Sequence, residues 1–83
     1  YLQALSEMAQ YRLGEGRPEQ ALALFQRAVN ENNKREDLHR QIMRLYTSLG
    51  RRSEAAAHYQ KMVHDLKDKV ASETRAVYEE IMA

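Results

Sequence analysis

The 83-residue chain contains no cysteine and no tryptophan, a single proline and only three glycines. Without cysteine it can form neither disulfide bonds nor thiolate-ligated metal sites, which suits a cytoplasmic setting. It has no apolar run near the ~20 residues that cross a bilayer and no signal peptide, so we expect no contact with a membrane. The net charge is only +1, which argues against a globally basic nucleic-acid binder. A chain of this length also has little interior, so we expect no enclosed catalytic cavity.

The sequence carries one internal repeat, because a shift of 34 positions superimposes residues of similar size and character. The matching pairs are Gly16 and Gly50, Ala21 and Ala55, Phe25 and Tyr59, Val29 and Val63, and Met8 and Ile42. A period of ~34 residues with a small residue before an aromatic one is typical of tetratricopeptide repeats, in which each unit is a pair of helices. One unit cannot cover its own apolar stripe, so neighbouring units must stack.

Helix-ending residues divide the first unit into two helices. The first helix is expected over about Leu2–Leu13, and Gly14 and Gly16 end it because glycine accepts the left-handed conformation of a helix end. Pro18 then stands in the first turn of the second helix, where its missing N–H costs nothing.

The second unit shows the same order, followed by one more helix. Asn33, with Glu36 three residues later, predicts the N-cap of a third helix that ends at Gly50. A fourth helix is expected over about Ser53–Lys69. Ser72 is expected to cap a fifth helix, which covers the apolar side of the fourth in place of a third repeat.

We therefore predict one all-α domain, a right-handed repeat of two tetratricopeptide-like helix hairpins with a C-terminal closing helix. Repeat one covers about residues 1–34, repeat two about 35–68 and the closing helix about 72–83. No segment alternates with period two, so we expect no strand. The tyrosines and methionines at helical spacing are expected to pack in the core or at groove edges. They are Tyr11, Tyr46, Tyr59, Tyr78, Met8, Met43, Met62 and Met82.

Four stretches, in this order, carry a closer likeness. They are Gly16–Phe25 (GRPEQALALF), Asp37–Tyr46 (DLHRQIMRLY), Leu49–Ala55 (LGRRSEA) and Ser72–Glu79 (SETRAVYE). Together they resemble the bacterial transcriptional activator domain, the tetratricopeptide-like region of Streptomyces antibiotic regulatory proteins and related regulators. The resemblance implies a place behind a winged-helix DNA-binding domain and a role in assembling or regulating a transcription activator. The chain begins with Tyr1 rather than methionine, which we interpret as the mark of a fragment of a larger regulator.

A basic segment lies in the middle of the chain, where residues 34–52 hold six basic and two acidic side chains. Arg40 and Arg44 share a helix face, and the repeat register places them on the side that lines the concave groove of tetratricopeptide arrays. There they can bind a carboxylate or an acidic peptide. Alternatively, Arg40 pairs with Glu36 and Arg44 is simply solvated. The residues of the predicted partner-binding groove are Gln3, Ser6, Gln10, Asp37, Arg40, Arg44 and Thr47.

No pattern in the sequence indicates catalysis, a cofactor or a metal site. His39, His58 and His64 lack the i,i+4 spacing of a helical metal site, and no cysteine is present to help. His58 stands four residues after Glu54, which we interpret as surface charge balance. There is no phosphate-binding loop, nucleophile elbow or dinucleotide fingerprint. We therefore expect a protein that is not an enzyme.

These observations favour a protein–protein interaction module of a bacterial transcriptional activator. The partner is a second copy, a neighbouring domain of the same chain or the transcription machinery. The basic segment has no helix-turn-helix pattern and no aromatic residues interleaved for base stacking, so DNA is contacted only through a domain outside this chain. Two alternatives remain open: a generic tetratricopeptide adaptor that binds a peptide segment, and a helical subdomain of a larger enzyme.

Overall fold

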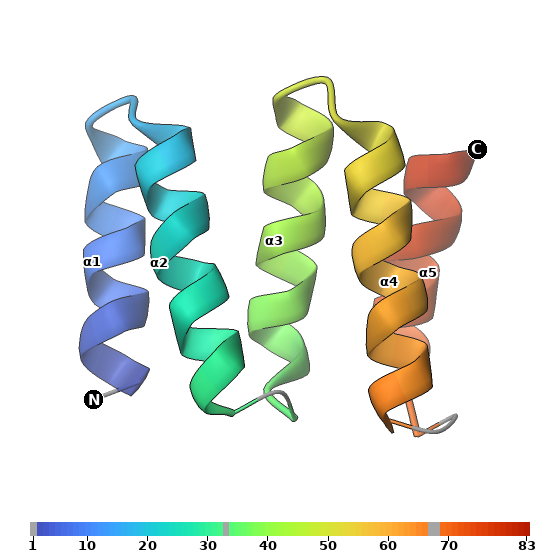
Figure 1. Ribbon diagram of the computed structural model, residues 1–83. Helices are drawn as coiled ribbons and strands as arrows, with labels where there is room; N and C mark the ends of the chain where they lie inside the picture. Colours follow the sequence, from blue (N-terminus) through green and yellow to red (C-terminus); the bar gives the residue numbers. More distant parts are fainter. Residues whose placement is uncertain (1, 33, 67–68) are drawn as a thin grey trace.

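The computed structural model describes residues 2–32, 34–66 and 69–83, which form five α-helices and, within these ranges, no strand. The helices are α1 (Leu2–Gly14), α2 (Pro18–Glu31), α3 (Glu36–Ser48), α4 (Arg52–Leu66) and α5 (Ser72–Met82). Figure 1 shows α1 to α4 side by side in chain order as two antiparallel hairpins, with α5 behind α4. The all-α architecture of two hairpins and a closing helix is therefore as predicted.

The two hairpins bend in the same way. Gly16 and Gly50 both have positive φ, +75° and +76°, which L-residues with a side chain rarely adopt. Each bend has the paired hydrogen bonds of a Schellman turn, which satisfy carbonyls at the end of the helix. Gly14 is the last residue of α1, as predicted, but it does not have positive φ, so the left-handed conformation expected of both glycines is found at Gly16 alone. The bonds, donor first, are Arg17 N–H to Arg12 O (2.9 Å), Gly16 N–H to Leu13 O (3.0 Å), Arg51 N–H to Tyr46 O (2.7 Å) and Gly50 N–H to Thr47 O (3.0 Å).

The start of α3 differs from the prediction. Arg35 occupies the N-cap position directly before Glu36 and makes no side-chain capping bond. Asn33, the predicted cap, lies outside the described residues and two positions before this one. Two acidic residues, Glu36 and Asp37, stand in the first turn, where negative charge favours the N-terminal end of a helix dipole.

The link between α4 and α5 also differs. The last helical residue of α4 is Leu66, and Lys69 is not helical, so the helix is shorter than predicted; residues 67–68 lie outside the described part. Ala71, not Ser72, is the N-cap of α5 and has extended backbone (φ −65°, ψ 149°). The Ala71 N–H donates to Glu36 Oε1 on α3 at 2.8 Å. A tertiary hydrogen bond thus fixes the entry into α5 where the sequence suggested a local cap.

Two groups of buried apolar side chains hold the helices together. The first joins α1, α2 and α3, and the second joins α3, α4 and α5 through Met43, Tyr59, Met62 and Val77. Fully burying one side chain of this size contributes about 1.5–3 kcal/mol. Small residues with no exposed surface let the helices approach closely. The members of the first group are Leu5, Ala9, Ala21, Leu22, Phe25, Ala28, Val29, Leu38, Ile42 and Leu45.

Three large apolar residues predicted to pack are exposed instead: Met8 (49%), Tyr11 (64%) and Met82 (48%). Met8 and Tyr11 are exposed because α1 is the first helix of the stack and packs mainly against α2. The residues 34 positions after Met8 and Tyr11 are Ile42 and Leu45, which α3 buries in the group that it shares with α2. None of the helices in the described part is long and apolar enough to cross a membrane.

Candidate functional site

Arg40, a central residue of the predicted groove, is engaged by the closing helix. Its Nη1 donates to Oγ1 of Thr74 at 2.8 Å, and Thr74 has no exposed surface. Arg40 therefore links α3 to α5 and does not pair with Glu36, which instead accepts the backbone N–H of Ala71. The structure thus uses this half-buried guanidinium to join two helices of the fold.

Asp37 is also engaged within the chain. Its two carboxylate oxygens accept hydrogen bonds from Arg35 Nε at 3.0 Å and Nη2 at 2.9 Å. The hydrogen bond from Arg35 is the main reason that the pKa of the Asp37 carboxyl is lowered. The pair is exposed, so it satisfies the charge of Asp37 without adding much stability.

Arg44 and Thr47 lie together at the edge of an open groove of about 460 Å³ between α3, the start of α4 and α5. Arg44 is exposed and makes no hydrogen bond or ion pair with any described residue. The Thr47 hydroxyl donates to the Met43 carbonyl at 2.9 Å. The groove residues that α4 and α5 contribute are Arg52, Val77, Glu80, Ile81 and Ala83.

Arg52, another residue of this groove, is bound to the end of α5. Its Nη2 donates to the carbonyl oxygens of Ile81 and, at 3.3 Å, Ala83. The last carbonyls of a helix have no partner within the helix. A guanidinium at this place donates hydrogen bonds to them and interacts favourably with the negative end of the helix dipole. Arg52 therefore stabilises the end of α5, while Arg44 remains available.

The predicted groove residues on α1 do not line this groove. Gln3 and Gln10 are exposed and Ser6 is half-buried, and Gln3 Nε2 donates to Glu7 Oε1 at 3.0 Å. Of the seven predicted residues, only Arg44 and Thr47 are brought together there.

The residues of α5 that the prediction missed had a signal in the sequence. Thr74 stands 34 positions after Arg40, and Val77 stands 34 positions after Met43. The repeat register therefore places α5 where a third hairpin would begin, next to α3.

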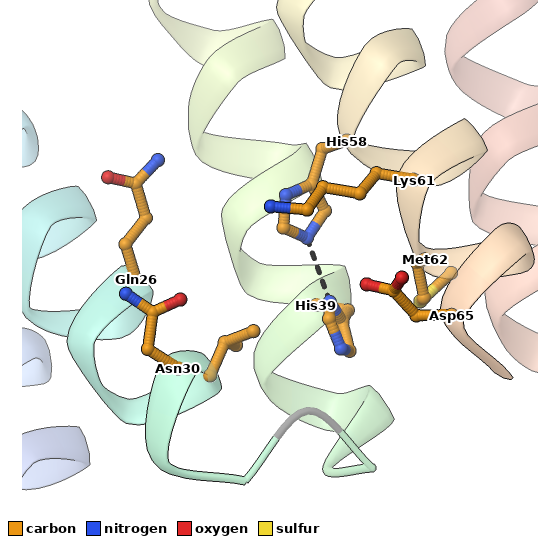
Figure 2. A pocket seen from close by; sticks show the side chains of 8 residues that line it. Gln26, Asn30, His39, His58, Lys61, Met62 and Asp65 are labelled. Atoms are coloured by element: carbon orange, nitrogen blue, oxygen red, sulfur yellow. Dashed lines mark hydrogen bonds between the residues drawn. The ribbon is translucent and has the colours of Figure 1, made fainter.

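A second polar cluster, between α3 and α4, was also missed. Nδ1 of His39 and Nε2 of His58 are 2.8 Å apart and share a hydrogen bond (Figure 2). Burial lowers the pKa of His58 to about 4, and the neighbouring charges of His39 and Lys61 add to the effect. The view that His58 only balances Glu54 at the surface is wrong, because His58 is half-buried against His39. Within the described ranges no group of three or more His, Cys, Asp or Glu is placed to hold a metal ion.

The fold and the open groove define a tetratricopeptide-like helical repeat domain whose closing helix covers the last hairpin. The family model for the bacterial transcriptional activator domain matches residues 1–82. The chain therefore belongs to this family, as the four sequence stretches suggested. No curated protein and no solved structure gives a match.

Proposed function

We propose that this transcriptional activator domain is a protein–protein interaction module that binds an acidic segment of its partner in the groove beside Arg44. The partner is a second copy, a neighbouring domain of the activator or the transcription machinery. Family membership supports the regulatory setting. The observation that carries the proposal is Arg44, an exposed guanidinium beside the apolar side chains of Val77 and Ile81.

The charge of Arg44 indicates the chemistry of the partner segment. Arg12, Arg35 and Arg51 each have a carboxylate within 3.0 Å in the same chain, and Arg44 has none among the described residues. A carboxylate from outside can therefore form charge-assisted hydrogen bonds with Arg44. An apolar side chain next to that carboxylate would cover Val77 and Ile81. We propose no catalytic or cofactor role for the domain, and a cytoplasmic location with DNA contacted through another domain.

The test is charge reversal at Arg44 in the full-length activator, read as transcription from a promoter that it controls. Arg44→Glu should reduce activation about tenfold or more, because the groove then repels an acidic segment. Arg75→Glu is the matched control, since Arg75 is an equally charged, exposed residue of α5 that does not line the groove. Arg40 is left intact because of its bond to Thr74.

Both variants should keep the wild-type melting temperature. Binding of the purified activator to RNA polymerase and to itself then identifies the partner, and the interaction that Arg44→Glu weakens should also weaken as salt rises. If Arg44→Glu activates transcription as well as Arg75→Glu does, the groove does not bind the partner and the proposal is wrong.

A further inference from the structure

A second hollow, of about 300 Å³, opens between the two hairpins and is independent of the Arg44 groove. Gln26 and Asn30 of α2 line one side, and His58, Lys61 and Asp65 of α4 line the other (Figure 2). No residue of α5 lines it. Nothing in the proposed binding of a protein partner uses these side chains.

The hollow contains a cation and an anion that do not neutralise each other. Lys61 and Asp65 are one turn apart on α4, and the order Lys before Asp is the less favourable one for a helical ion pair. Neither forms a hydrogen bond or ion pair with a described residue. Figure 2 shows Lys61 running past the ring of His58, while the Asp65 carboxylate points toward His39.

The other lining residues of α2 and α4 are neutral near pH 7. His58 is bound to His39 and is uncharged near pH 7, so it adds hydrogen-bonding capacity but no charge. Asn30 adds an exposed amide, and Val29 and Met62, both buried, add an apolar wall.

We infer that this hollow binds a free α-amino acid with an apolar side chain. Lys61 would hold the carboxylate, Asp65 the ammonium group, and Val29 and Met62 the side chain. A ligand with negative charge alone would be repelled by Asp65, and one with positive charge alone by Lys61. The volume is at the small end of ligand pockets, which suits a molecule of about ten non-hydrogen atoms.

The test is a titration of the chain with L-leucine, followed by NMR of the α2 and α4 amides. Because Lys61 and Asp65 are exposed, we expect a dissociation constant of about 1 mM. N-acetyl-L-leucine lacks the ammonium group and L-leucinamide lacks the carboxylate, so each should bind about tenfold more weakly or worse. Equal binding of either analogue would contradict the two-charge arrangement.

Variants separate the site from general surface effects. Lys61→Met and Asp65→Asn should each weaken leucine binding about tenfold, whereas Lys69→Met and Glu54→Gln, which change exposed charges outside the hollow, should not. Melting temperatures of all four should match the wild type. The absence of saturable binding up to about 50 mM leucine, or binding unchanged in Lys61→Met and Asp65→Asn, would overturn the inference.

Discussion

The equivalence of the two hairpin bends can be tested by replacing each glycine with alanine. Gly16 and Gly50 have nearly the same positive φ, and a Cβ added at either meets no atom within 4 Å. The cost is therefore the backbone strain of an L-residue in the left-handed region, about 1–2 kcal/mol. Alanine also lowers the conformational entropy of the unfolded chain, which raises the free energy of unfolding by about 0.4–1 kcal/mol. We expect each substitution to lower the free energy of unfolding by about 1 kcal/mol.

Gly14 is the internal control. It is also a glycine with open space around its Cβ position, but it is helical and has no positive φ. Gly14→Ala should therefore raise the free energy of unfolding, by about 0.5 kcal/mol or more. Gly14→Ala and Gly16→Ala, two residues apart in the sequence, are thus expected to change the free energy of unfolding in opposite directions.

Urea denaturation followed by circular dichroism at the helix band measures these changes. The double variant Gly16→Ala with Gly50→Ala should lose about 2 kcal/mol, because neither added Cβ meets another atom within 4 Å and the two effects should add. At this chain length each kcal/mol corresponds to roughly 4–8 °C in melting temperature. The reasoning is refuted if Gly50→Ala is neutral while Gly16→Ala is costly, or if Gly14→Ala destabilises as much as either.

Two further predictions concern the polar contacts of α3. Because the pKa of His58 lies near 4 in the folded chain and near 6.5 when unfolded, the unfolded state binds more protons between these values, so stability should fall as pH drops from 6.5 to 4. The loss should be about 2–3 kcal/mol in urea midpoints analysed at each pH, and it should largely vanish in His58→Gln. A double-mutant cycle of Arg40→Met and Thr74→Val should give a coupling of about 1 kcal/mol, since their hydrogen bond is partly buried. A coupling near zero would show that the Arg40–Thr74 hydrogen bond does not help to hold α5 against α3.

The helices and bends could be predicted from the sequence because they depend on local physics. Apolar residues at helical spacing, Pro18 at a helix start and glycine at the two left-handed positions leave few alternatives. The errors fall where a tertiary contact replaced a local one. Ser72 is a good capping residue, yet the N–H of Ala71 is satisfied by Glu36 from another helix.

The sequence predicted only part of the groove, again because a tertiary contact was not foreseen. Register arguments place side chains on a helix face, and Arg44 is indeed exposed on α3. Applied to the two hairpins alone, they do not show that α5 packs on the same face and binds Arg40 through Thr74; the register has to be extended by another 34 positions, to Thr74, to place α5 there. The two arginines look equivalent in the sequence, but one stabilises the fold and the other faces solvent.

The histidine pair can be compared with the equivalent positions of the first hairpin through the 34-residue repeat. A shift of 34 positions places His39 on Leu5 and His58 on Leu24, which both pack in the first apolar group. Imidazoles at such positions lose water on burial and need a hydrogen-bonding partner. Each supplies the other, and no buried side-chain N or O atom in the described part lacks a partner. Because polar rings replace leucines there, the second hairpin contributes hydrogen-bonding groups to the hollow at positions where the first hairpin has apolar packing.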